Sequence, residues 1–245
     1  MRIRAIHAMT GSTPESLERE RQLFKKYGSP DTVVDIVCIT EGAASIESRF
    51  DEYIGAVNTL KLVKESEELG YDAVIITCWG NACLEPAREI VNIPVVSSGL
   101  ASMVIAAGIA HRFSIIGTIK NAVHRHVVEV RKLGLENLFA SERFVDTFVL
   151  ELSSDRQKTI SAIIDAGRKA IDEDGAQCLI LGCFGFAGFA EEISEVLQVP
   201  VIDPAAAVIN YTESLVRMGI SQSKIAYPTP PDKPRSFGFG GSCGL

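Results

Sequence analysis

The feature that most constrains the fold of this 245-residue chain is a strand-turn-helix unit that occurs twice. In the first copy, the apolar strand Ala73–Thr77 leads into Cys78-Trp79-Gly80. In the second copy, the apolar strand Cys178–Leu181 is followed, after a single glycine, by Cys183-Phe184-Gly185. A helical stretch and an Ile-Pro-Val or Val-Pro-Val segment come next, with the proline 16 residues after the first cysteine and 17 after the second. The duplication predicts two halves that fold alike.

Short β-branched runs alternate with longer amphipathic stretches along the chain. The likeness between the halves extends upstream of the two cysteines, since Arg2–Thr10 is similar to Arg112–Thr118 and Thr32–Thr40 is similar to Val145–Ser153. We expect strands at Ile3–Ala8, Thr32–Ile39, Ala73–Thr77, Val95–Ser97, Phe113–Gly117, Phe144–Leu150, Cys178–Leu181 and Val201–Ile202.

Alternating strands and helices favour mostly parallel sheets flanked by helices. Together with the duplication, this predicts an α/β fold of two pseudo-symmetric lobes with a cleft between them. We expect residues 1–97 plus 208–227 to form the first lobe, 98–207 the second, and 228–245 a Pro/Gly-rich tail. Ligands of open α/β sheets bind at the carboxyl ends of the strands, so we expect the equivalent strand ends to face each other across the cleft.

The charge balance limits the possible partners. The chain has 24 basic and 31 acidic residues and a net charge of −7, which argues against a nucleic-acid partner because that needs a basic face. Its apolar stretches are shorter than the ~20 residues that a membrane span requires, and its first residues do not form a secretory signal. We expect a cytoplasmic homo-oligomer that acts on a small-molecule substrate, without a membrane or nucleic-acid partner.

The six cysteines are expected to be free thiols, since a chain of this size needs no disulfides and a reducing cytosol is expected. Cys78 and Cys183 each lie where a strand turns into a helix, and a helix N-terminus favours the thiolate. Gly80 and Gly185 let backbone amides approach a bound carbonyl or carboxylate. Two thiols on opposite walls of a cleft fit removal of a proton next to a carbonyl by one sulfur and its return by the other. Alternatively, each cysteine is a small buried hydrophobic residue.

The four cysteines in the two repeat units could instead hold zinc. However, Cys178 and Cys183 are separated by roughly 15 Å along a strand and point to different faces, so we expect no metal site. No Gly-x-Gly-x-x-Gly turn or phosphate-binding loop is present, and we therefore expect chemistry without a cofactor. We assign Cys83 to the helix after the first repeat turn, Cys38 to the core and Cys243 to the tail.

The histidines argue against a hydrolase of the nucleophile-elbow type, in which the histidine follows the nucleophile. All four histidines precede Cys183. His7 ends the first strand near the expected cleft, where contact with a ligand and simple packing are both open. His124 and His126 are two residues apart on a predicted helix and do not share a face, so we expect both to be exposed.

The chain resembles the aspartate/glutamate/hydantoin racemase superfamily, and most closely its hydantoin racemase branch, from Arg2 to about Gly219. The segments that carry the resemblance are Ala73–Pro94, Gly182–Ala207, Ala44-Ser45-Ile46-Glu47 with Asp51-Glu52, and Phe113–Thr118. The resemblance implies a pseudo-symmetric two-lobed fold and racemisation without a cofactor, with Cys78 and Cys183 as the catalytic acid and base.

The resemblance also implies which residues contact the substrate. His7 is added to them because it ends the first strand near the expected cleft. The candidate substrate-binding residues are His7, Thr10, Ser45, Trp79, Gly80, Asn81, Thr118, Phe184 and Gly185. Two segments depart from the family pattern. The usual Asn-Pro-Asn-Thr turn after the first strand is replaced by His7-Ala8-Met9-Thr10, and the usual acidic residue and proline after the first Cys-aromatic-Gly are replaced by Asn81-Ala82. These changes affect the choice of substrate rather than the cysteine pair.

We therefore expect an isomerase, a racemase or epimerase acting on a carbon next to a carbonyl, with a 5-substituted hydantoin or an amino-acid-like compound as substrate. One alternative is an enzyme similar to maleate isomerase or arylmalonate decarboxylase, in which one cysteine is the nucleophile or the proton donor. Another is a non-catalytic protein that binds a small ligand in the same cleft.

Overall fold

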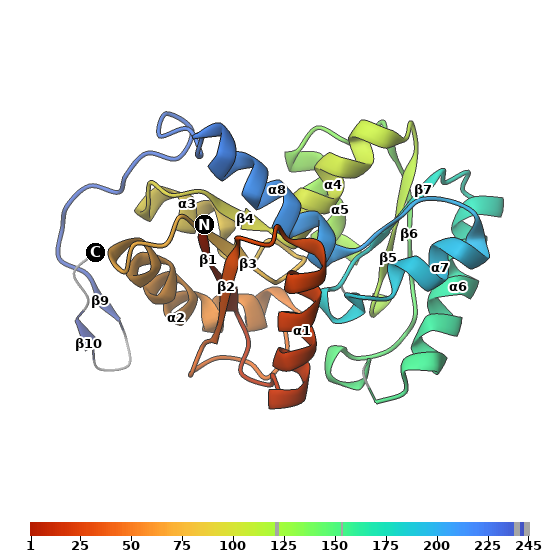
Figure 1. Cartoon of the computed structure of the whole chain (residues 1–245), viewed down its shortest axis with the longest axis horizontal. Coiled ribbons are helices and arrows are strands. Elements are labelled where there is room, and N and C mark those ends of the chain that lie inside the picture. Colours follow the sequence, from red (N-terminus) through yellow and green to blue (C-terminus); the bar gives the residue numbers. More distant parts are fainter. Residues whose placement is uncertain (121–122, 153, 238–240, 243–245) are drawn as a thin grey trace.

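The computed structural model describes residues 1–120, 123–152, 154–237 and 241–242. Two four-stranded parallel sheets form its main body (Figure 1). The strands of the first sheet are β1 (Arg2–His7), β2 (Val33–Cys38), β3 (Ala73–Ile76) and β4 (Val95–Ser97), in the order β2-β1-β3-β4. Those of the second are β5 (Phe113–Gly117), β6 (Phe139–Phe144), β7 (Cys178–Leu181) and β8 (Val201–Ile202), in the order β6-β5-β7-β8. The matching orders confirm the predicted α/β fold with two pseudo-symmetric lobes.

Helices follow the strands in the same sequence in both halves. They are α1 (Pro14–Tyr27), α2 (Arg49–Glu68), α3 (Leu84–Ile90) and α4 (Ser98–Ile109) in the first half, and α5 (Val123–Lys132), α6 (Arg156–Asp172), α7 (Ala190–Leu197) and α8 (Pro204–Met218) in the second. Within the described ranges, no helix is both long enough and apolar enough to cross a bilayer.

The predicted position of the sixth strand is wrong. We expected it at Phe144–Leu150, but β6 covers Phe139–Phe144, so the segment equivalent to β2 begins earlier than the proposed match with Val145–Ser153. The reason is that β6 carries polar side chains whose partners are distant in sequence. Arg143 Nε, for example, donates to Asp174 Oδ2 at 2.8 Å. Apolar content therefore pointed to the wrong segment.

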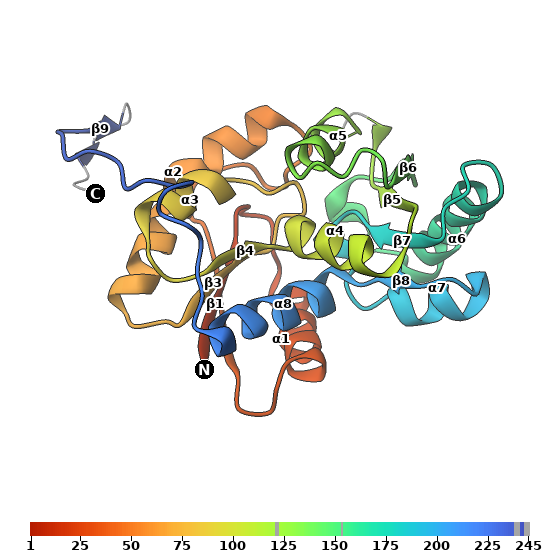
Figure 2. The same cartoon turned by 90° about the horizontal axis from the view of Figure 1, so that it is seen from above.

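The last helix of each half packs on the other half. Helix α4 follows β4 of the first sheet but contacts β7 and β8 of the second, and α8 follows β8 but contacts β3 and β4. The two helices also contact each other, and Figure 2 shows them in the middle of the molecule. The lobe boundary that we expected between residues 207 and 208 consequently lies inside α8.

Helix α1 is fixed at both ends, and this orients its inner face. Thr13 is the N-cap, with its Oγ1 accepting from the Ser16 N–H at 3.2 Å, and the Gly28 N–H donates to the Phe24 carbonyl at 2.8 Å. Glu20 and Phe24, one turn apart, are both buried on the side that faces the rest of the protein.

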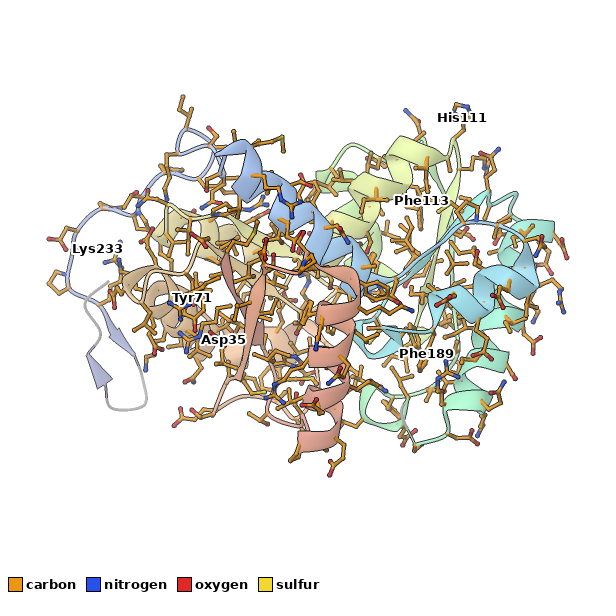
Figure 3. All side chains as sticks on the ribbon, viewed as in Figure 1. Asp35, Tyr71, His111, Phe113, Phe189 and Lys233 are labelled. Carbon is orange, nitrogen blue, oxygen red and sulfur yellow. The ribbon has the colours of Figure 1, made fainter. Side chains whose placement is uncertain are left out.

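Apolar residues fill the interior of both lobes. Phe113 is fully buried, whereas His111 and Lys233 extend outward from the body (Figure 3). At the edge of the first lobe, Tyr71 Oη donates to Asp35 Oδ2 at 2.7 Å.

After α8, the chain folds back over the first lobe. Gln222 Nε2 donates to the carbonyls of Val91 at 3.0 Å and Ile93 at 2.9 Å, and Lys224 Nζ donates to the carbonyl of Arg88 at 2.9 Å. Beyond this contact, β9 (Ser236–Phe237) and β10 (Gly241–Ser242) form an antiparallel pair that stands apart from the two sheets (Figure 1).

Candidate active site

The two cysteines predicted to be catalytic lie beyond the carboxyl ends of equivalent strands. Cys78 follows β3 and Cys183 follows β7, which occupy the same place in the two sheet orders. Both residues line one cavity of about 140 Å³, whose walls come from both lobes. Because a cavity of about 150 Å³ can hold a benzene ring, this volume admits a small cyclic molecule.

Cys78 lies in a buried turn with a cation nearby. Burial raises the pKa of the Cys78 thiol, the positive charge of Arg125 lowers it, and the negative charge of Glu52 raises it further. Hydrogen bonds from the N–H groups of Ala82 and Gly80 favour the thiolate. The net result is a pKa above the ordinary value, so the thiol is protonated at neutral pH.

Cys183 has a similar environment in the other lobe. The Gly185 N–H donates to Cys183 Sγ at 3.4 Å. Burial raises the pKa of Cys183 to about 12, although this N–H and the charge of Arg125 oppose the rise. A thiolate at Cys78 raises the pKa of Cys183 as well. The two thiols are thus coupled electrostatically, and ionisation of one disfavours ionisation of the other.

We had expected both cysteines to adjoin the N-terminus of an α-helix, but neither does. Helix α3 begins at Leu84, after a turn in which Asn81 and Cys83 have φ angles of 59° and 57°. Cys183 leads into a single turn of 3-10 helix, Phe184–Phe186, and α7 starts later. The prediction of lowered thiol pKa values is therefore wrong, because burial outweighs the few N–H groups that these turns provide.

His7 lines the cavity and is held on both ring nitrogens. Its Nε2 lies 2.6 Å from Glu20 Oε2, and the Ser12 Oγ lies 3.0 Å from its Nδ1. The ring also packs edge-on against Phe184, with 6.2 Å between centroids. With both nitrogens engaged, His7 contributes a packed wall next to the second Cys-aromatic-Gly turn.

His126 occupies a comparable place on α5. Its Nδ1 lies 2.5 Å from Glu142 Oε1, and its ring packs edge-on against Trp79 at 4.5 Å between centroids. His126 is buried and lines the cavity, so the expectation of an exposed side chain is wrong for this residue. The side chain of His124 lies outside the part that the structure describes.

Five more of the candidate substrate-binding residues also line the cavity, namely Trp79, Gly80, Thr118, Phe184 and Gly185. At Gly80 the reason for a glycine is visible, because a Cβ built there would lie 3.1 Å from Arg125 Nη2. The absent side chain lets the guanidinium lie against the turn that carries Cys78.

Thr10 and Ser45 do not line the cavity. Thr10 Oγ1 donates to the carbonyl of Ala43 at 3.2 Å, and Ser45 Oγ donates to Glu47 Oε2 at 2.9 Å. Thr10 thus ties the loop after β1 to the loop after β2, whereas the hydrogen bond of Ser45 stays within the loop after β2.

Asn81 also lies outside the cavity lining. Its Oδ1 accepts from Ser97 Oγ at 2.5 Å and from the Leu100 N–H at 3.0 Å, and its Nδ2 donates to Glu129 Oε2 at 3.0 Å. Asn81 thus joins the first repeat turn to α4 and to α5 of the other lobe.

The comparisons with known proteins agree with this geometry. Residues 7–212 match the family model described as Asp/Glu/Hydantoin racemase. The chain belongs to this family. It is 34% identical to the hydantoin racemase of Paenarthrobacter aurescens over 95% of this chain and 99% of that one. It is 33% identical to the hydantoin racemase of Pseudomonas sp. (strain NS671) over 87% of this chain and 86% of that one.

The fold of the family is also found in solved structures. An allantoin racemase from Klebsiella pneumoniae has a TM-score of 0.91 and 31% identity, covering 97% of each chain. Arylmalonate decarboxylase is more distant, with a TM-score of 0.63 and 16% identity over 88% of this chain and 92% of that one, and shares the fold alone.

Several cavity residues carry no motif that marks them in the sequence. Arg19 and Glu20 reach the cavity from α1, and Arg125 reaches it from α5. The sequence contains one signal for Glu20. It lies four residues before Phe24, so this acidic side chain shares a helix face with a large apolar one. Nothing comparable distinguishes either arginine from those on exposed helix faces.

The remaining cysteines lie elsewhere. Cys178 is buried within β7, and Cys83 is the N-cap residue of α3 rather than part of the helix. Cys243 lies outside the described residues. Within the ranges that the structure describes, no three His, Cys, Asp or Glu side chains gather closely enough to hold a metal ion.

Proposed function

We propose that this protein is a racemase or epimerase of small carbonyl compounds with an acidic C–H next to the carbonyl, with 5-substituted hydantoins as the leading class. The observation that carries this proposal is the pair Cys78 and Cys183, which reach one ring-sized cavity from equivalent positions of two lobes. Membership of the racemase family and the likeness to hydantoin and allantoin racemases support it.

In the proposed reaction, the substrate carbon lies between the two sulfurs. One cysteine, as the thiolate, takes the proton from one face of the carbon. The other cysteine, as the thiol, gives its proton to the opposite face. Carbon thus loses one proton and gains another, the configuration inverts, and the two cysteines exchange protonation states. The reverse reaction follows the same steps, and no redox change occurs.

The buried thiols suit this chemistry. A thiol with a raised pKa forms a stronger base once it is ionised, and a carbon acid requires a strong base. The charge of Arg125 favours ionisation at both cysteines. Because ionisation of Cys78 disfavours that of Cys183, the second cysteine stays protonated once the first has ionised, and one thiolate facing one thiol is the state that the reaction needs.

The test is racemisation in heavy water. We expect the wild type to exchange the C5 hydrogen of a hydantoin for deuterium and to remove the optical activity of either enantiomer. Cys78→Ser and Cys183→Ser should each lower the racemisation rate by about 10²–10⁴-fold, the usual contribution of a general acid or base. Cys38→Ser, which changes a thiol outside the cavity lining, is the matched control.

The alternatives give different results in the same experiment. Full racemisation by both serine variants would overturn the two-cysteine mechanism. Turnover of maleate or an arylmalonate, with a covalent adduct on Cys78 in the former case, would indicate an isomerase or a decarboxylase. Binding without any deuterium exchange would indicate a non-catalytic protein.

A further inference from the structure

Two arginines reach the cavity wall without a carboxylate partner. Arg125 on α5 is only 8% exposed; its Nη1 donates to the Ser48 carbonyl at 3.2 Å, and its Nε is buried without a partner among the described residues. Arg19 on α1 lines the cavity too, and its Nε is buried without a partner. Among the residues that the structure describes, no carboxylate forms an ion pair with either guanidinium.

The carboxylates around the cavity already have partners within the protein. Glu20 faces His7 at 2.6 Å, and Glu142 faces His126 at 2.5 Å. Glu52, which influences Cys78, pairs with Arg49 at 3.0 Å.

Glu47, which influences Cys183, is occupied by hydrogen bonds from Ser45 Oγ at 2.9 Å and from the Val149 N–H at 2.9 Å. Arg125 is therefore a buried cation of the cavity wall that has no charged partner among the described residues. A buried charge without a partner is costly, and a negatively charged ligand would remove that cost.

The thiols alone do not supply acceptors for both arginines. Since the two cysteines disfavour each other's ionisation, the resting cavity supplies at most one thiolate. Arg125 influences both thiols, so a thiolate can be its partner before substrate binds. The buried Nε of each arginine still lacks an acceptor, and the bound substrate is the group that can supply one.

Building on the proposed racemase function, we infer that the natural substrate carries a carboxylate in addition to its reacting carbonyl, and that Arg125 and Arg19 recognise this carboxylate. Guanidinium groups bind carboxylates through two parallel hydrogen bonds, and the buried Nε of Arg125 is an unused donor. The cavity volume of about 140 Å³ limits the acidic substituent to a short one.

The experiment compares two hydantoins of nearly equal shape, one with a carboxymethyl group at C5 and the other with a carbamoylmethyl group. Deuterium exchange at C5 is followed by NMR, with the rate in the absence of protein subtracted. Calorimetry measures the binding of each compound in parallel. The variants are Arg19→Gln, Arg125→Gln and Arg125→Lys. Arg21→Gln, at an exposed ion pair on α1, is the matched control.

We expect the wild type and Arg21→Gln to prefer the carboxylate over the amide by at least about tenfold in kcat/KM, as a charge-assisted hydrogen bond implies. Arg125→Gln and Arg19→Gln should reduce this ratio toward one, and Arg125→Lys should retain part of it. Equal rates for the two compounds in the wild type would overturn the inference and leave the racemase proposal standing. An equal loss of both rates in Arg125→Gln with an unchanged ratio would also overturn it, since Arg125 would then act on the thiols alone.

Failure of the racemase proposal gives a separate result. If neither compound exchanges deuterium, calorimetry still decides the charge preference. Tighter binding of the carboxylate that weakens at least about tenfold in Arg125→Gln would support the anion site without racemisation. Equal binding of the two compounds would overturn the anion site.

Discussion

Gly99 lies directly against the carbonyl of Trp79: a Cβ built on Gly99 would lie 1.9 Å from that oxygen. The first turn of α4 thus packs on the backbone of the turn that carries Cys78. Because the obstacle is backbone rather than a flexible side chain, a larger residue at position 99 must displace one of the two segments.

Gly99→Ala is expected to destabilise the protein by about 1–3 kcal/mol, the usual cost of overpacking a core, and to lower the reaction rate by moving Cys78. Urea unfolding and deuterium exchange measure the two effects. Gly108→Ala is the matched control, since Gly108 lies in the same helix and a Cβ there meets nothing within 4 Å. It should stabilise the protein by about 0.5–1 kcal/mol, because alanine favours the helix. Equal stabilities for the two variants would contradict the close approach.

Asn81→Ala should destabilise the protein by about 2–4 kcal/mol. It removes the hydrogen bonds to Ser97, Leu100 and Glu129 and places alanine at a φ of 59°. Asn81→Gly, which relieves the backbone strain but lacks the same hydrogen bonds, should recover only part of the loss in urea unfolding. Full recovery would mean that the side-chain bonds contribute nothing.

Glu213 should make the stability depend on pH in the acid range. Burial alone would raise the pKa of Glu213, but hydrogen bonds from Ser29 and Thr32 and the charge of Arg217 outweigh it, so the pKa lies below 4.5. The folded state therefore favours the carboxylate, and the stabilisation is present above about pH 4.5 and is lost as the pH falls through the lower folded-state pKa.

Glu213→Gln should consequently be less stable than the wild type by about 1–3 kcal/mol at pH 7, with the difference shrinking below pH 4.5. Thermal unfolding between pH 2 and pH 7 measures this, and Glu18→Gln at an exposed site is the control. A difference that grows as the pH falls would contradict the assigned direction.

The cavity thiols should react slowly with iodoacetamide at neutral pH. Burial raises the pKa of Cys78 and raises that of Cys183 to about 12, so the thiolate fraction is smaller than for a free cysteine. The alkylation rate, measured by mass spectrometry, should therefore continue to rise as the pH exceeds 9. In Arg125→Gln the alkylation rate should be lower still. An apparent pKa below that of N-acetylcysteine at either residue would contradict this, and Cys78→Ser and Cys183→Ser assign the signal.

The duplicated Cys-aromatic-Gly units made both the two-lobed fold and the shared cavity predictable, because equivalent strand ends of the two sheets face one cleft. The position of β6 was not predictable from apolar content. Its polar residues find partners on other elements, as Arg143 does with Asp174, and local sequence does not contain that information.

The cavity wall was predictable only in part. Trp79 and Phe184 follow from the repeat, but Arg19 and Arg125 depend on which faces of α1 and α5 turn toward the cleft. The thiol pKa values were mispredicted because the sequence shows the glycines of the turns but not the depth at which they lie.

The exchange of α4 and α8 between the lobes has a consequence for the order in which the protein can fold. The first sheet is complete once β4 has been made, but α8, which covers part of it, is the last helix of the main body to be synthesised. The N-terminal half must therefore leave an apolar surface of its sheet uncovered on the ribosome until α8 has emerged, and it reaches its final packing only when α8 has been added.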